Sequence, residues 1–470
     1  MQQAEIGLIG LGVMGSNLAL NIAEHGYRVA VWNRTTEKTK SFAETAGELA
    51  DRIVPCETLD HLVAAIRPPR PIILMVQAGA AVDEQIAALR PLLSADDILI
   101  DAGNANFRDT MRRFSELEGS SLTFIGMGVS GGEEGARHGP SIMVGGTQAS
   151  WLRVRDVLTA ISAKYRGEPC VAWLGRNGAG HFVKTIHNGI EYADMQMIAE
   201  IYGILRDGAR LDTDAMARLF EQWNGGRLES YLIEITAKVL AATDPETGRP
   251  MVDMIVDSAG QKGTGRWSVI EAQMMGVPAT AIEAAVAARG LSALKAERQA
   301  AEALYGAPGA GFGQADIRAA VDDLELALLA GKIAAYAQGF AVMEAASRDF
   351  DWGLPMATIA RIWRAGCIIR SQFLDTIAEA FEGEPPANLM AAPRFVDLMQ
   401  EAVPSLRRTV SRAALAGIPV PALSASLAYF DAYRTARGTA NLVQAQRDFF
   451  GAHGFERLDR PGAHHGPWGG

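Results

Sequence analysis

The stretch 5-EIGLIGLGVMGSNLALNIAEHG-26 decides the fold of the N-terminal part of the chain. EIGLI (5–9) is a short apolar run that is typical of a buried strand, and NLALNIAEHG (17–26) predicts a helix. Between them stand Gly10, Gly12 and Gly15, in the spacing G-x-G-x-x-G. This spacing between a strand and a helix is the dinucleotide fingerprint. We therefore expect a Rossmann-type, doubly wound α/β domain.

The fingerprint also predicts how a dinucleotide would be held. Gly10 permits a tight turn, Gly12 lets a pyrophosphate approach the backbone, and Gly15 lets the helix pack closely. Val13 and Met14 open the helix, where free N–H groups attract anionic phosphate. The alternative is an ordinary tight turn between a strand and a helix, but its position at the first strand favours cofactor binding.

The end of the second predicted strand bears on the choice of cofactor. After RVAVW (28–32) come Asn33, Arg34 and Thr35, where an NAD site usually has an acid for the ribose 2′-hydroxyl. A guanidinium can instead pair with a 2′-phosphate, and the two neighbours can add hydrogen bonds. We therefore expect NADP, with a solvent-facing arginine as the alternative.

Two later loops also follow predicted strands, at the edge where doubly wound sheets bind ligands. We expect them to touch the adenosine or the nicotinamide riboside, although turn chemistry alone would explain their composition. The residues concerned are Val76, Gln77, Ala78 and Asn104.

The chain divides into regions with different sequence patterns. Up to about residue 175, apolar strands alternate with helical patterns, which predicts a parallel sheet covered by helices. From there to about 430 the pattern is helical with few strand signals, and the last forty residues end in a Gly/Pro-rich tail. We expect a cofactor domain over 1–177, a large all-helical domain over 178–430 and an extended tail over 431–470.

The composition excludes several classes of protein. The 470 residues carry a net charge of −10 without a Lys/Arg-rich run, so nucleic acid and anionic membranes are unfavourable partners. Three separated cysteines indicate reduced thiols rather than a disulfide framework. The N-terminus has no signal-peptide pattern and apolar runs are interrupted by polar residues. These features predict a soluble, cytoplasmic protein.

The helix predicted from HFVKTIHNGIEYADMQMI (181–198) has a polar face where an apolar one is usual. Positions i, i+3, i+4, i+7 and i+8 are Lys184, His187, Asn188, Glu191 and Tyr192. Burying these groups would be costly unless each found a partner, so we expect them to line a functional cavity. The alternative is a solvated helix surface, which the apolar residues on the other faces disfavour.

Other segments supply candidate anion contacts. Ser130, Gly131 and Gly132 lie in a glycine-dense turn that would present N–H groups to a carboxylate. GQKGTGRW (260–267) superficially resembles a phosphate loop. However, Arg and Trp stand where the phosphate-loop motif has Lys and Ser/Thr, which argues against a nucleoside triphosphatase. Its Lys262 still suits a phosphate, and further cationic candidates are Arg289, Arg447 and His453. The spacing of ligands predicts no metal site.

Seven motifs together resemble the 6-phosphogluconate dehydrogenase family, the decarboxylating enzymes of the pentose phosphate pathway. They occur in the family's order and span nearly the whole chain: GLGVMGSNLALNI, WNRT, SGGEEGAR, GHFVKTIHNGIEYADMQ, GQKGTGRW, WRAGCIIRS and ANLVQAQRDFFGAH. DAGNANF and Gln77 depart from the family pattern, both near the expected nicotinamide site.

The resemblance implies roles for the candidate residues. Lys184 resembles the general base and Glu191 the general acid, with NADP as the cofactor and 6-phosphogluconate as the substrate. The substrate contacts would be Asn104, Ser130, Gly131, Gly132, His187, Asn188, Tyr192, Lys262, Arg289, Arg447 and His453. The last two would come from the tail of the partner subunit in a homodimer.

Two other functions remain open at this point. Other β-hydroxyacid dehydrogenases, such as those of the 3-hydroxyisobutyrate type, share the Rossmann start and a catalytic lysine followed by asparagine. A catalytically silent NADPH-binding sensor would keep the fingerprint but has no need of Lys184 and Glu191, which are both present.

Overall fold

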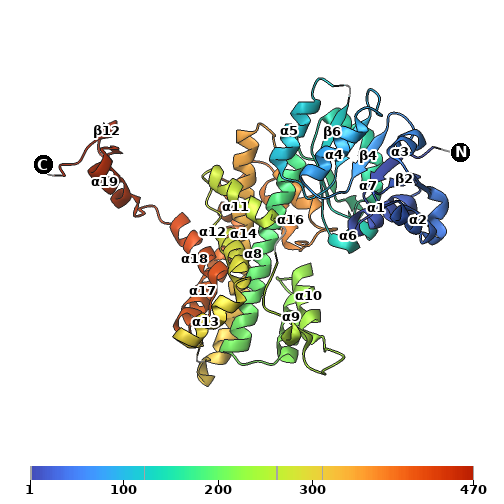
Figure 1. Ribbon diagram of the computed structural model, residues 1–470. Helices are drawn as coiled ribbons and strands as arrows, with labels where there is room; N and C mark the ends of the chain where they lie inside the picture. Colours follow the sequence, from blue (N-terminus) through green and yellow to red (C-terminus); the bar gives the residue numbers. More distant parts are fainter. Residues whose placement is uncertain (1–2, 121, 261–262, 308, 310, 469–470) are drawn as a thin grey trace.

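The computed structural model describes residues 3–120, 122–260, 263–307, 309 and 311–468. It consists of a sheet covered by helices, a larger helical part and a tail that extends away from both (Figure 1). The fold class predicted from the sequence is confirmed by this architecture.

The main sheet has eight strands in the order β10-β7-β6-β5-β4-β1-β2-β3. From β3 to β6 this is the Rossmann order, with all neighbours parallel. The strands are β1 (Ile6–Ile9), β2 (Val29–Trp32), β3 (Ile53–Pro55), β4 (Pro71–Leu74), β5 (Ile98–Asp101), β6 (Thr123–Val129), β7 (Ile142–Val144) and β10 (Val171–Trp173).

The sheet differs from the sequence prediction in one respect. β7 pairs with β6 in the antiparallel direction, and β10 then pairs with β7 in parallel, so the sheet is mixed rather than purely parallel. The connection between them, residues 130–141, contains α6 (Gly132–His138) and returns the chain in the opposite direction along β6.

Helices cover both faces of the sheet, and their apolar sides pack on the buried Val, Ile and Leu residues of the strands. They are α1 (Val13–Glu24), α2 (Thr36–Glu44), α3 (Leu59–Ala65), α4 (Ala80–Leu89), α5 (Phe107–Leu117) and α7 (Gln148–Ile161), with the 3₁₀ turn η1 (Gly47–Arg52). A small hairpin of β8 (Lys164–Tyr165) and β9 (Glu168–Pro169) precedes β10.

The helical part is organised around two long helices, α8 (Ala179–Gly203) and α14 (Gln314–Asp349), which pack on each other. α14 is long and apolar enough to cross a membrane, but 89% of its most apolar window is buried inside the fold. It packs against α8, α17 and α18, so its apolar character is that of a core helix.

The remaining elements of the helical part surround this pair. They are the π turn η2 (Ile204–Gly208), α9 (Thr213–Asn224), α10 (Tyr231–Ala241), η3 (Met251–Met254), α11 (Thr264–Met274), α12 (Thr280–Ser292), α13 (Lys295–Tyr305), α15 (Met356–Ile362), α16 (Phe373–Ala380), η4 (Leu389–Ala391), α17 (Pro393–Leu415) and α18 (Pro421–Tyr433).

The tail forms a small unit of its own, separated from the body in Figure 1. It contains α19 (Ala440–Gly451) and a hairpin of β11 (Phe455–Glu456) and β12 (Ala463–His464). The buried Asp448 carboxylate joins these pieces, because it accepts hydrogen bonds from Gly454 N at 2.9 Å, Gly466 N at 2.9 Å and Trp468 Nε1 at 2.6 Å. The tail therefore has an ordered shape of its own, and Figure 1 shows its described residues apart from the body.

Candidate active site

The polar face of α8 is buried, as its spacing predicts. His187 is fully buried, and Lys184, Asn188 and Tyr192 are each 7% exposed. Lys184 Nζ donates to Ser130 Oγ at 3.0 Å, and Ser130 Oγ lies 3.3 Å from His187 Nε2. His187 Nδ1 lies 3.1 Å from Asn188 Oδ1. A chain of hydrogen bonds thus connects the helix to the end of β6.

Close backbone packing holds Lys184 over this strand. A Cβ at Gly128 of β6 would lie 2.5 Å from Lys184 Cβ and 3.1 Å from the Gly180 carbonyl oxygen. The absence of a side chain at Gly128 lets α8 lie directly on the strand. The amine is therefore carried to the carboxyl edge of the sheet, which is the edge where doubly wound folds bind ligands.

Burial controls the protonation of the two groups with proposed acid–base roles. It lowers the pKa of the Lys184 amine from its ordinary value, and the nearby Glu191 carboxylate opposes that shift. Burial raises the pKa of Glu191, against the influence of Lys184 and Arg289. Each shift favours the uncharged form, so a neutral amine and a protonated carboxyl can coexist on one helix face.

His187 supports this arrangement as a neutral group. Burial holds the pKa of its imidazole well below the usual range, and the nearby Lys184 lowers it further. Nδ1 lies 3.7 Å from Glu191 Oε2, while the ring packs edge-on against Trp363 with centroids 5.4 Å apart. His187 Nε2 can therefore accept a hydrogen bond from the Ser130 hydroxyl and orient that hydroxyl for Lys184.

The glycine-dense turn after β6 is shaped by the segment around Gly366. Gly131 has a φ of +98°, and a Cβ there would lie 2.6 Å from the Gly366 carbonyl oxygen. That oxygen also accepts from Ser141 N at 2.7 Å. The segment around Gly366 therefore supports the turn that holds Ser130, Gly131 and Gly132.

Helix α11 closes the other side of the α8 face. A Cβ at Gly265 would lie 2.5 Å from the Tyr192 ring, and a Cβ at Gly189 would lie 2.8 Å from Ser268 Cβ. The mid-helix glycine of α8 is thus explained by the approach of α11. The guanidinium of Arg289, from α12, lies 3.6 Å from the centroid of the Tyr192 ring. Lys262 lies outside the described residues.

The cofactor candidates line a cavity of about 350 Å³ above the carboxyl ends of β1, β2 and β4. Gly10, Gly12, Asn33, Arg34, Thr35, Val76 and Gln77 belong to its lining. Val13, Met14 and Gly15 lie in the first turn of α1 just beyond it, and Ala78 follows Gln77.

The backbone geometry of the fingerprint suits a bound dinucleotide. Gly10 has a φ of +99°, and a Cβ at Gly15 would collide with the Gly10 carbonyl oxygen. A Cβ at Gly12, in contrast, would meet no described protein atom within 4 Å, so the space above it is open to a ligand. Asn33 Oδ1 accepts from Leu11 N at 3.0 Å and joins the second strand to the fingerprint.

Lys38 is a cation of this cavity that the sequence analysis missed. It lies in the first turns of α2, and its side chain lines the same cavity as Arg34. The spacing i, i+4 was visible in the sequence, but the start of α2 had to be known before the two side chains could be placed together. With Arg34 it offers a second positive charge to a 2′-phosphate.

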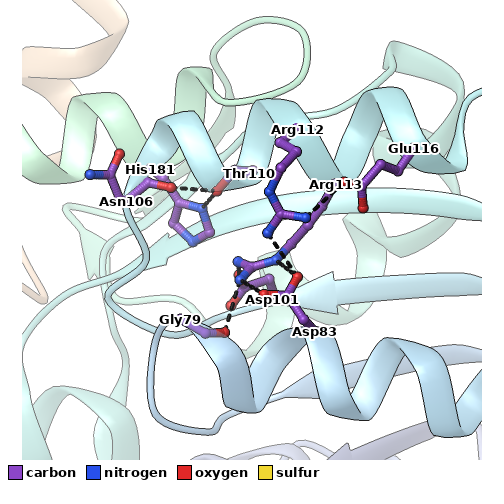
Figure 2. Close-up of polar contacts among 9 residues, drawn as sticks. All are labelled: Gly79, Asp83, Asp101, Asn106, Thr110, Arg112, Arg113, Glu116 and His181. Atoms are coloured by element: carbon purple, nitrogen blue, oxygen red, sulfur yellow. Dashed lines mark hydrogen bonds and ion pairs between the residues drawn. The ribbon is translucent and has the colours of Figure 1, made fainter.

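The loop after β5, residues 102–106, carries Asn104 to the same edge of the sheet. A buried network fixes it from beneath: Arg113 Nη1 donates to Asp101 Oδ2 at 3.3 Å, and Arg113 Nε donates to Asp83 Oδ1 at 2.8 Å. Figure 2 shows this network beside Thr110, whose hydroxyl lies 2.7 Å from His181 Nδ1 of α8. Asn104 itself is exposed.

The two tail candidates lie elsewhere. Arg447 and His453 are exposed on the tail, which Figure 1 shows far from α8 of the same chain. Arg447 Nη1 donates to Gln444 Oε1 within α19 at 2.7 Å. The structure therefore does not bring these cations to Lys184 of their own chain.

Among the described residues, no group of three or more His, Cys, Asp or Glu side chains has metal-binding geometry. Cys56, Cys170 and Cys367 are buried and free of disulfides. Burial raises the pKa of Cys367 to about 12, so it is a protonated thiol and a poor nucleophile.

Comparisons with known proteins match the whole chain. Residues 5–175 match the NAD binding domain of 6-phosphogluconate dehydrogenase, and residues 180–468 match the C-terminal domain of the same enzyme. The chain is 48% identical to the NADP(+)-dependent decarboxylating 6-phosphogluconate dehydrogenase of Bacillus subtilis over 469 residues, which is all of both chains. It is 46% identical to the NAD(+)-dependent enzyme of that organism, covering 98% of this chain and 99% of that one.

A solved structure gives the same result. The Plasmodium falciparum 6-phosphogluconate dehydrogenase, described in its apo form and in complexes with NADP+ and with 6-phosphogluconate, has a TM-score of 0.96 and 42% identity. The match covers 99% of this chain and 100% of that one. The resemblance inferred from the seven motifs is confirmed.

Proposed function

Because the chain belongs to the 6-phosphogluconate dehydrogenase family, we propose that it oxidises and decarboxylates 6-phosphogluconate to ribulose 5-phosphate and CO₂. The observation that carries the proposal is the buried face of α8, with the Lys184 amine and Glu191 beside the carboxyl edge of a dinucleotide-binding sheet. NADP+ supplies the hydride acceptor, and the cavity with Gly12, Arg34 and Lys38 suits it.

The first step needs a base at the C3 hydroxyl of the substrate. Neutral Lys184 takes that proton as the C3 hydride leaves, and the product of the oxidation is a 3-keto acid. Burial lowers the pKa of Lys184 and so favours the unprotonated amine that this role requires. The Ser130 hydroxyl holds the amine in place by accepting its hydrogen bond, and His187 in turn holds that hydroxyl.

The second step needs no metal, because the carboxylate of the intermediate is β to a ketone. Protonated Lys184 donates to the C3 oxygen while the C1–C2 bond breaks, and the electron pair of that bond enters a C2–C3 enediol as CO₂ leaves. Glu191 then gives its proton to C2 and Lys184 recovers the C3 hydroxyl proton, which yields ribulose 5-phosphate. The raised pKa of Glu191 suits a proton donor.

The test is turnover with 6-phosphogluconate. We expect NADPH and CO₂ in equal amounts from the wild type, and a loss of about 10²–10⁴-fold in kcat for Lys184→Ala, with NADPH binding retained. More than about a tenth of wild-type kcat in Lys184→Ala would contradict the base assignment. NADPH binding without turnover of the wild type would favour the sensor.

We propose further that the protein is a cytoplasmic homodimer whose tail completes the partner's site. The tail leaves an apolar side of α19 largely exposed, with 53–73% of the surface of each side chain accessible at Leu442, Val443, Phe449 and Phe450. Arg447 and His453 lie beside them and would bring cations to a substrate phosphate. Sedimentation of the full chain should give the mass of a dimer, and a monomer at assay concentration would contradict the exchange.

A further inference from the structure

A bidentate ion pair joins the sheet part to the helical part beside the candidate site. Arg108 Nε donates to Glu271 Oε1 at 2.8 Å, and Arg108 Nη2 donates to Glu271 Oε2 at 2.6 Å. The Glu271 side chain is 4% exposed and that of Arg108 is 48% exposed. Among the described residues, Arg108 donates both hydrogen bonds of this buried carboxylate, so the position of Glu271 depends on Arg108.

At one end, the pair is attached to the loop that carries Asn104. Arg108 is the second residue of α5, and its backbone N–H donates to the Asn106 side chain at 2.9 Å. Further along α5, Arg113 ties the helix to Asp101, the residue from which the loop leaves the sheet. Hydrogen bonds therefore join α5 to both ends of the loop on the cofactor side.

At the other end, the pair is attached to the helix that faces the substrate. Gly265, Ser268 and Glu271 follow one another at i, i+3 and i+6, so they lie along one side of α11. Gly265 contacts the Tyr192 ring and Ser268 contacts Gly189, both on α8. The same side of α11 thus packs on the α8 face near its start and is tied to α5 near its end.

We infer that Arg108 and Glu271 are positioning residues that couple the cofactor side of the site to the substrate side. Movement of the 102–106 loop on cofactor binding is passed through α5 and the ion pair to α11, and so to the substrate contacts near Tyr192. Neither side chain belongs to the lining of the cofactor cavity, and among the described residues the Glu271 carboxylate accepts hydrogen bonds from Arg108 alone. The inference rests on the proposed function for the identity of the two ligands.

The experiment is hydrogen–deuterium exchange of residues 264–274 with and without saturating NADPH, in the full-length protein. NADPH should slow exchange in this segment by about fivefold in the wild type and by less than about 1.5-fold in Glu271→Gln. That variant keeps the size of the side chain and leaves Arg108 half exposed to water, so it should fold. Arg108→Lys is the second variant, because it keeps the charge but loses the fork of two donors.

A matched control is Arg407→Ala. Arg407 makes a similar bidentate pair with Asp431, with both bonds at 2.7 Å, between α17 and α18 on the surface. It should retain the full effect of NADPH on 264–274. A structural role alone would change the melting temperature of Glu271→Gln but not the ratio of exchange rates with and without NADPH.

Steady-state kinetics provide the second readout. Glu271→Gln should raise the KM for 6-phosphogluconate about fivefold and change kcat less than about threefold. The inference is overturned if NADPH leaves 264–274 unaffected in the wild type, or if both variants keep the wild-type ratio. Lack of wild-type turnover would instead overturn the proposed function, while the exchange ratio, which uses NADPH alone, still decides the role of the pair.

Discussion

Removal of one member of the buried pair between α8 and α14 should cost far more stability than removal of both. Lys332 Nζ lies 2.5 Å from Asp194 Oδ2, and the two side chains are 4% and 2% exposed. Asp194 Oδ1 has no hydrogen-bond partner among the described residues. Lys332→Met therefore leaves a carboxylate without a counter-charge in the core, which costs about 3–5 kcal/mol of unfolding free energy.

The double variant Asp194→Leu/Lys332→Met separates the charge effect from packing. Two apolar side chains of similar volume avoid the desolvation of both ions, so we expect the double variant to lie within about 2 kcal/mol of the wild type. Asp194→Leu alone should cost about as much as Lys332→Met alone. In this double-mutant cycle, the coupling free energy between Asp194 and Lys332 would then exceed the loss of unfolding free energy in either single variant.

Urea unfolding followed by circular dichroism measures these differences, at one fixed protein concentration because subunit association contributes to stability. Lys238→Met is the control: Lys238 pairs with Glu234 on the surface of α10, with side chains 70% and 42% exposed, and should change stability by less than about 0.5 kcal/mol. The reasoning is refuted if either single core variant costs under about 1 kcal/mol, or if the double variant costs their sum.

Two further predictions concern the chemistry of the site. Glu191 raises the pKa of Lys184, so in Glu191→Gln that pKa should fall and the rising limb of kcat/KM against pH should move to lower pH; a move to higher pH would contradict the assignment. Arg34→Ala should lower kcat/KM for NADP about 10–100-fold and leave that for NAD within about threefold, because a charged hydrogen bond is worth about 1.5–3 kcal/mol. Steady-state rates with both cofactors test this, and equal use of NAD and NADP by the wild type would refute the predicted preference.

The parts of the fold that were predictable depend on local patterns. The glycine fingerprint identified the first strand and helix, because the turn between them constrains both backbone and spacing. The polar face of α8 was also predictable from a local pattern, because its five polar residues recur at the spacing of one side of a helix. β3, β7 and β10 have only three residues each, too short to give a periodic signal, and the antiparallel direction of β7 depends on the path of the chain between β6 and β7, which no local pattern encodes.

The parts that could not be predicted depend on contacts between distant segments. Arg108 and Glu271 are 163 residues apart, and each alone looks like a charged residue on a helix. Lys38 joins the cofactor cavity only once the start of α2 is known. Arg113 is 1% exposed although its side chain is charged, because the fold brings the carboxylates of Asp83 and Asp101 within hydrogen-bond distance of its guanidinium.

The separation of the tail from its own body has a genetic consequence if the exchange we propose occurs. A polypeptide with a defective α8 face still offers an intact tail, and one with a defective tail still offers an intact α8 face. A mixed assembly of two such polypeptides would contain one whole catalytic centre and one doubly damaged centre. Two alleles that are each inactive would then restore part of the activity when expressed together.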